Sequence, residues 1–261
     1  MSPLDRDLLA QRAMLLERAL ILSSMRAADL VPYLPLVTTV AAAVFARQVW
    51  RRWRSRGGNH HLWWPIGVAA YGLGTFAESW MTLFGQGPWI FKSWYVVGAL
   101  LGAAPLAQGT VWFLMRPATA RRLTFALVLA VTVASACVLA SPVDLTAVKG
   151  HVPSGRAFAW QWVRAFSPFI NTYAVIFLVG GALYSALHWW RRMREGAEDG
   201  PVARDRMFGN LGIAVGAILP GIGGASARAG HTEVLYVTEL VGILLIWAGF
   251  WLNVRKRPDA R

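Results

Sequence analysis

The chain has 261 residues, of which 56% are hydrophobic and only 15% are charged, and its 26 Lys and Arg against 13 Asp and Glu give a net charge of +13. Soluble domains contain about 25% charged residues, so this chain has too few charges for an ordinary water-facing surface. A nucleic-acid-binding protein displays its basic residues on a solvated face, whereas here short basic clusters separate long apolar runs. The composition therefore excludes a nucleic-acid partner and predicts a membrane protein.

The first 29 residues form a segment of their own. An apolar stripe recurs at helical spacing, and it consists of Leu4, Leu8, Leu15, Leu22 and Met25. Acidic residues near the start, and the lack of a small-residue cleavage site after a short apolar core, argue against a secretory signal. Residues 1–29 are therefore predicted to form an amphipathic helix lying in the membrane interface. The alternative is that this helix caps the outer mouth of the bundle that follows.

Seven later stretches approach the roughly 20 residues that a helix needs to cross the hydrocarbon core. They are Leu30–Trp50, Leu62–Phe84, Ile90–Met115, Leu123–Ala140, Pro168–Trp190, Met207–Ser226 and Val234–Val254. The sequence thus predicts an all-α integral membrane protein, with a seven-transmembrane-helix bundle over residues 30–254 and a basic cytoplasmic tail over residues 255–261.

The basic residues predict the orientation of the bundle. The segments 51–61, 116–122, 191–206 and 255–261 hold sixteen of the Lys and Arg residues, and their alternation with the apolar stretches places all four on one side. That side is cytoplasmic by the positive-inside rule. We therefore expect the N-terminus outside, the C-terminus inside, and a multi-pass protein of a bacterial-type inner membrane in contact with membrane lipids.

Glycines in two of the stretches predict close helix packing. Gly98 and Gly102 have the four-residue spacing that lets helix backbones touch, and Gly212, Gly216, Pro220 and Gly224 repeat it in the sixth stretch. Pro220 interrupts helical hydrogen bonding, so Pro220, Gly221 and Gly224 are predicted to form a flexible wall of the bundle. Tight packing without any hinge is the alternative explanation.

Ionisable residues inside a span are expensive, and two acids qualify as candidate functional groups, Glu78 and Glu239. Tyr71, Thr75 and Glu78 share one face of the second span, which should turn toward the bundle interior. At 1.5 Å per residue, Glu78 and Glu239 lie about 9 and 8 Å below the outer ends of their spans. Tyr95 and Asn171 fall at a similar depth, and a common polar pocket in the outer half of the bundle is predicted.

Three functions fit such a pocket. The first is binding, sensing or transport of a proton, a lipid or another small molecule, in which Glu78 and Glu239 are central and Tyr71, Thr75, Tyr95 and Asn171 assist. A small apolar or amphipathic ligand belongs to this class. The alternative is a structural or assembly subunit of a larger membrane complex, in which the same groups only hold helices to one another and to a partner. An intramembrane enzyme stands third.

The sequence lacks the residues that several known membrane-protein chemistries require. The seventh span has no Lys for a retinal Schiff base, and no two His residues pair inside a span to ligate haem. The adjacent His60 and His61 border a basic segment and are better read as an interfacial pair than as metal ligands. Ser226 and His231 lack a nucleophile elbow. The sequence therefore assigns no catalytic residue, no metal ligand and no cofactor, and it favours a protein that is not an enzyme.

Overall fold

The structure is a computed structural model that describes residues 30–147, 153–195 and 200–255. Over these residues the chain is helical, apart from turns and one isolated antiparallel bridge between Val143 and Phe158, so the prediction of an all-α protein is confirmed. The predicted amphipathic segment 1–29 and nearly all of the basic tail lie outside the described residues. Both stay predictions.

The helices follow the predicted spans closely. In chain order the elements are η1 (Val31–Tyr33), α3 (Leu34–Arg56), α4 (Asn59–Phe84), α5 (Pro88–Trp94), η2 (Tyr95–Leu100), α6 (Ala104–Leu114), α7 (Pro117–Ala140), η3 (Leu145–Ala147), η4 (Gly155–Ala157), η5 (Gln161–Ala165), α8 (Phe166–Ala174), η6 (Val175–Val179), α9 (Gly180–Arg194), α10 (Gly200–Arg228) and α11 (Thr232–Val254).

Five segments of the described chain are long and apolar enough to cross a membrane, which indicates a multi-pass membrane protein. They are Pro88–Leu114, Pro117–Ala140, Gln161–Arg194, Gly200–Arg228 and Glu233–Val254, and they coincide with the last five predicted spans. The first two predicted spans fall on α3 and α4. These helices are long but less apolar, because α3 ends in a run of arginines and α4 contains two His, three Gly and three Trp.

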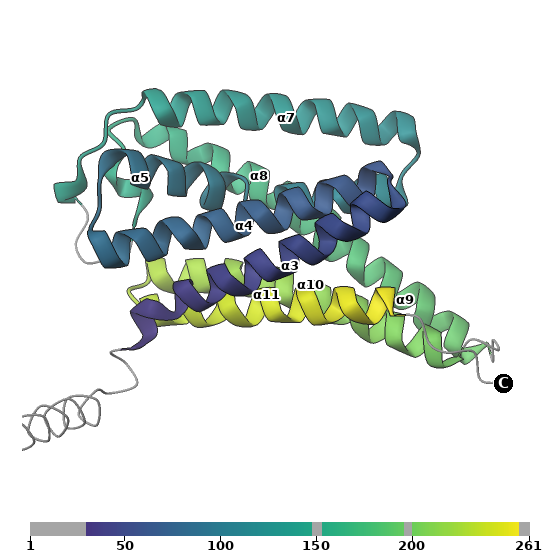
Figure 1. Cartoon of the computed structure of the whole chain (residues 1–261). Coiled ribbons are helices and arrows are strands. Elements are labelled where there is room, and N and C mark those ends of the chain that lie inside the picture. The colour runs from purple at the N-terminus through teal and green to yellow at the C-terminus, as the bar shows by residue number, and fades with distance from the viewer. Residues whose placement is uncertain (1–29, 148–152, 196–199, 256–261) are drawn as a thin grey trace, which may run out of the picture.

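Figure 1 shows the helices running back and forth between two ends of the molecule. At one end, α3, α9 and α11 finish and α4, α7 and α10 begin, and this "basic end" carries Arg51–Arg56, Arg116 and Arg191–Arg194. The opposite "loop end" carries residues 85–87, 141–147, 153–160 and 229–231. α8 and α9 cross the bundle as one long diagonal, from beside α7 to beside α10 (Figure 1).

The third predicted span is not one regular helix. α5 passes into a π-helix, η2, and a turn at residues 101–103 precedes α6. Pro105 stands in the first turn of α6, directly after this turn, where the helix needs no N–H from it. Gly98 faces Gly74, and a Cβ on Gly74 would lie 2.9 Å from the Gly98 Cα, so α4 and η2 touch backbone to backbone.

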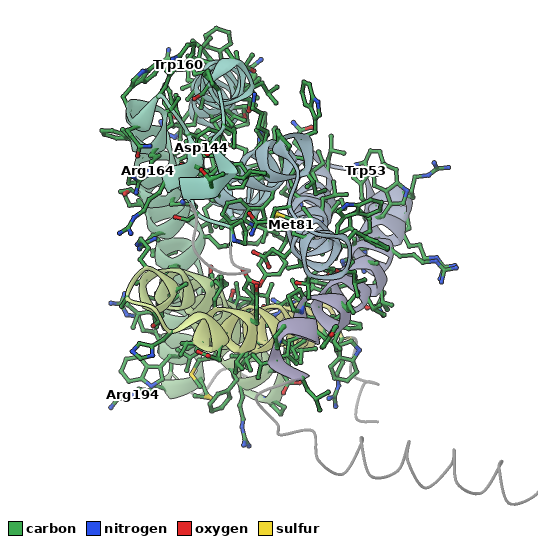
Figure 2. All side chains as sticks on the ribbon, turned by 90° about the vertical axis from the view of Figure 1, so that its left-hand side faces the viewer. Trp53, Met81, Asp144, Trp160, Arg164 and Arg194 are labelled. Atoms are coloured by element: carbon green, nitrogen blue, oxygen red, sulfur yellow. The ribbon has the colours of Figure 1, made fainter. Side chains whose placement is uncertain are left out.

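The connection between α7 and α8 folds onto the loop end. The amide of Asp144 donates to the carbonyl of Ala157 over 2.8 Å, which holds the two arms of the connection together. Phe158 is 1% exposed and its ring centroid lies 4.8 Å from that of Tyr95. Figure 2, which views the loop end, shows Asp144, Trp160 and Arg164 on the α7–α8 side of the molecule. The loop thus covers an apolar cluster between α5, α7 and α8.

Candidate functional site

Glu78 lies on the buried face of α4. Thr75 and Glu78 are 3% and 4% exposed, and Tyr71 is half-buried, so this stripe turns away from the surface as its spacing predicts. Met81, one turn further on, is 3% exposed, and Figure 2 shows it pointing from α4 into the interior. The helix therefore carries a carboxyl group into the centre of the molecule.

One oxygen of this carboxyl group receives a hydrogen bond from α5. The indole Nε1 of Trp94 donates to Oε1 of Glu78 over 2.8 Å. The contact between Gly74 and Gly98, one turn earlier on α4, allows the two helical segments to come this close. Trp94 resembles an interfacial belt residue in the sequence, and its role as a hydrogen-bond donor to Glu78 is not evident there.

Glu239 reaches the same place from α11. Its carboxyl group lies close enough to that of Glu78 for the two groups to interact electrostatically. A carboxylate has no donor, so a hydrogen bond between the two groups requires that one of them carries a proton. The structure thus brings together the two acids that the sequence places at one depth, although 161 residues separate them in the chain.

Tyrosine hydroxyl groups lie around the Glu78–Glu239 pair. The Tyr71 hydroxyl donates to the backbone carbonyl of Glu239 over 2.8 Å and so ties α4 to α11. Tyr236 lies one turn before Glu239 and is 4% exposed, and its hydroxyl group lies near both carboxyl groups. Thr75 bonds away from the pair, since its Oγ1 lies 3.0 Å from Oγ1 of Thr39 on α3. Tyr236 is a member of the site that the sequence reading missed.

The remaining carboxyl oxygens lack partners. Oε2 of Glu78 and Oε2 of Glu239 are each buried and make no hydrogen bond in the structure. Buried polar atoms are almost always hydrogen-bonded, and an unpaired buried acceptor is destabilising by about 1–3 kcal/mol. Two such atoms in one place mark a site where the fold tolerates that loss of stability.

Tyr95 and Asn171 contact other groups. The Asn171 amide donates to the carbonyl of Ala99 over 3.2 Å and to Oγ of Ser167 over 3.0 Å. Tyr95 packs in the apolar cluster beneath the loop end, against Phe158. Equal depth placed these residues beside the glutamates in the sequence analysis, but depth alone does not specify which side of a helix a residue occupies. No contact of either with the carboxyl pair is found among the described residues.

The basic residues near the loop end also have partners elsewhere. Lys92 donates to the carbonyl of Leu139 over 2.7 Å, and Arg164 donates to Oε1 of Gln161 over 2.8 Å. Both serve local backbone or side-chain acceptors. They do not neutralise the carboxyl pair.

The predicted flexible wall is a continuous part of α10. This helix runs unbroken from Gly200 to Arg228 through Pro220. Pro220 packs against α11, where a Cβ on Gly242 would lie 3.2 Å from the Pro220 Cδ. Gly221 has nothing near its Cβ position, and Gly224 meets only the far end of Arg228 there. Pro220 therefore belongs to the helix interface, while Gly221 and Gly224 do not, and whether this region bends stays a prediction.

The described residues contain no group of three or more His, Cys, Asp and Glu side chains arranged to hold a metal ion. No protein-family model, curated protein or solved structure matches the chain. Function is therefore inferred from the carboxyl pair and its neighbours.

Proposed function

We propose that this protein is a seven-helix inner-membrane protein that binds a proton at the Glu78–Glu239 pair and uses it in transport or sensing. The observation that carries the proposal is the buried pair itself, with one unpartnered oxygen on each side chain. Ionisable groups are rare inside membrane helices because charge is poorly solvated there, and those that occur mark proton and substrate pathways.

The seven-helix topology is supported by length and charge. α3 and α4 have 23 and 26 residues, so at 1.5 Å per residue they extend over about 35 and 39 Å, more than the hydrocarbon thickness of about 30 Å. Both pack in the same bundle as the five apolar segments. With α3 and α4 as spans, all the arginine-rich connections share one side, and the positive-inside rule makes the basic end cytoplasmic.

A proton is the ligand that suits the space around the pair. The Oε2 atoms of both glutamates are shielded from solvent, so a larger ligand reaches them only if neighbouring side chains move. Two surface hollows of the described residues, of about 590 and 240 Å³, are lined by neither glutamate. A proton shared between two carboxyl oxygens needs no added volume.

The second candidate is the structural or assembly subunit. Its supporting observation is that Trp94 and Tyr71 bond Glu78 and Glu239, so that α4, α5 and α11 are held at one point. Inter-helix hydrogen bonds in membranes contribute about 0.6–2 kcal/mol each, enough to fix helix orientation. Under this function the pair needs no change of protonation.

The test is a Glu78→Gln variant reconstituted in liposomes and in lipid nanodiscs. Glutamine keeps an acceptor for Trp94 but cannot release or take up a proton. We expect Glu78→Gln and Glu239→Gln to lose the pH-dependent carboxylic C=O band in infrared difference spectra, and to lose proton flux into liposomes driven by a membrane potential. The matched control is Glu233→Gln, on an exposed residue two turns earlier on the same helix.

The structural function predicts the opposite pattern. In that case the wild type shows no titrating carboxyl band and no proton flux, and Glu78→Gln changes only the thermal stability or the recovery of a complex. A wild type whose buried carboxyl band is unchanged between pH 4 and pH 9 overturns the proton-binding proposal.

A further inference from the structure

Trp94 is held in one place by the side chains and backbone around it. It is the last residue of α5, directly before the π-helix η2, and its side chain is half-buried. The rings of Phe91 and Tyr95 lie beside it, with centroids 5.7 and 6.0 Å from its own. A Cβ on Gly98, one turn further on, would lie 3.6 Å from its Nε1. Packing on several sides therefore fixes the direction of the indole N–H.

The hydrogen bond from Trp94 distinguishes the two protonation states of Glu78. An indole N–H can only donate, and it donates to Oε1 of Glu78 over 2.8 Å. A hydrogen bond to an ionised carboxylate is roughly twice as strong as one to a neutral acceptor. The bond therefore stabilises the Glu78 side chain more when it is ionised than when it carries a proton.

The described part of the chain gives the Glu239 carboxyl group no comparable donor. Its Oε2 makes no hydrogen bond, and the Tyr71 hydroxyl, which reaches Glu239 from α4, donates to the backbone carbonyl instead. Two carboxylates buried at close range repel one another, which favours a pair that holds one proton. Because only Glu78 has an indole donor, that proton is more stable on Glu239.

The other titratable groups around the pair do not reverse this difference. The Tyr236 hydroxyl on α11 lies near both carboxyl groups. Lys92 of α5 donates to a backbone carbonyl of α7, and the Arg228 guanidinium at the end of α10 lies alongside Gly224 of its own helix. Tyr33 of η1 is exposed, and α6, which also packs on α4, has no titratable side chain. Trp94 is thus the donor that makes the two glutamates unequal.

We infer that Trp94 is a positioning residue that keeps Glu78 ionised and confines the bound proton to Glu239. The inference rests on the proposed proton-binding function and adds to it which of the two acids carries the proton. A tryptophan that only docks α5 on α4 would leave the proton free to occupy either carboxyl group.

The experiment follows the protonation state of each glutamate by carbon-13 NMR. The protein is labelled at the carboxyl carbon of glutamate and reconstituted in lipid nanodiscs, and Glu78→Gln and Glu239→Gln variants assign the two signals. The chemical shift of this carbon differs between the acid and the carboxylate. At a pH where the wild-type pair holds one proton, we expect Glu239 to show the shift of the acid and Glu78 that of the carboxylate.

The matched variants are Trp94→Phe and Trp89→Phe, which make the same change on one helix. Trp94→Phe removes the N–H but keeps an aromatic ring, and Trp89 is 74% exposed. We expect Trp94→Phe to raise the share of the proton on Glu78 about ten-fold or more, because a charge-assisted hydrogen bond is lost. Trp89→Phe should keep the wild-type distribution. An unchanged distribution in Trp94→Phe, or an equal change in both variants, overturns the role of Trp94.

The wild-type spectrum separates this inference from proton binding itself. Signals that titrate, with the proton on Glu78 or shared equally, uphold proton binding and reject the role of Trp94. Signals that do not move with pH contradict the proton-binding function, while the two shifts still show which acid holds a fixed proton. If Trp94→Phe does not fold, the wild-type assignment decides, since a proton on Glu78 contradicts the inference.

Discussion

Buried polar side chains in this molecule fall into two kinds, which Gln108 and the glutamate pair exemplify. Gln108 is fully buried, and its amide is satisfied on both sides, since Oε1 accepts from Tyr173 and Nε2 donates to Oγ1 of Thr124 over 2.7 Å. Glu78 is equally enclosed but keeps one oxygen without a partner. A satisfied network stabilises helix packing, whereas an unsatisfied one is a place where a ligand gains free energy by binding.

Substitution of Gln108 tests this distinction at a single residue. Gln108→Leu leaves the Tyr173 hydroxyl without its acceptor in the interior, so we expect a loss of about 1–2 kcal/mol in the free energy of unfolding. Proton binding at the glutamates should be unchanged. Thermal unfolding in detergent measures the first effect and the infrared band the second.

The control for this substitution is Gln48→Leu. Gln48 is exposed on α3 and makes one side-chain hydrogen bond, from Trp247 over 2.9 Å. Its replacement should lower stability by less than about 1 kcal/mol. If both leucine variants unfold at the same temperature, burial of the Gln108 network contributes nothing beyond an ordinary surface bond.

The pairing of Glu78 with Glu239 was predictable from sequence, since few acids lie deep in the spans and their depths match. The residues that surround the pair, Trp94 and Tyr236, were not predicted. Trp94 occupies the position of an interfacial residue in the sequence. Tyr236 lies three residues before Glu239 and so shares a helix face with it, a spacing that could have identified it. Tyr95 and Asn171 contact other groups in the structure, because helix rotation and the π-helical turn after Trp94 decide which side chains converge.

At the scale of helices, the most extensive contact is between α10 and α11. A Cβ on Gly216 would lie 2.6 Å from the carbonyl oxygen of Gly242, and one on Gly209 would lie 2.8 Å from that of Gly249. The tightest contacts repeat every seven residues, with Gly223 meeting α11 one step further, and Gly212 and Pro220 of the predicted four-residue series also lie against α11. A seven-residue repeat keeps small residues on the seam between two helices that cross at a shallow angle.

Alanine substitutions on α10 distinguish the glycines that contact α11 from those that do not. Gly216→Ala places a methyl group against backbone atoms that cannot move aside, so we expect a loss of about 1–3 kcal/mol in stability. Gly221→Ala meets nothing within 4 Å and should change stability by less than about 0.5 kcal/mol. Thermal unfolding of the two variants in the same detergent gives the comparison. A destabilised Gly221→Ala would instead indicate that the Pro220 region needs glycine for bending.

At the scale of the whole molecule, the topology rests on whether α3 and α4 cross the membrane. Apolar content alone identifies five spans, because the hydropathy of α3 and α4 is reduced by arginine and by aromatic and small residues. The two topologies place the α3–α4 connection on opposite sides. With seven spans it lies inside, next to the other basic segments; with five it lies outside.

Single-cysteine labelling decides between them. Cys137 is the one cysteine in the chain, so a Cys137→Ala background accepts Ser55→Cys at the α3–α4 connection, Thr119→Cys at the start of α7 and Ala229→Cys after α10. All three positions are exposed. A membrane-impermeant maleimide applied to intact spheroplasts should label Ala229→Cys at once, and should label Ser55→Cys and Thr119→Cys only after permeabilisation. Labelling of Ser55→Cys on intact spheroplasts, with Thr119→Cys protected, would establish five spans and place α3 and α4 on the outer surface, where the Glu78–Glu239 pair could not lie within the hydrocarbon core.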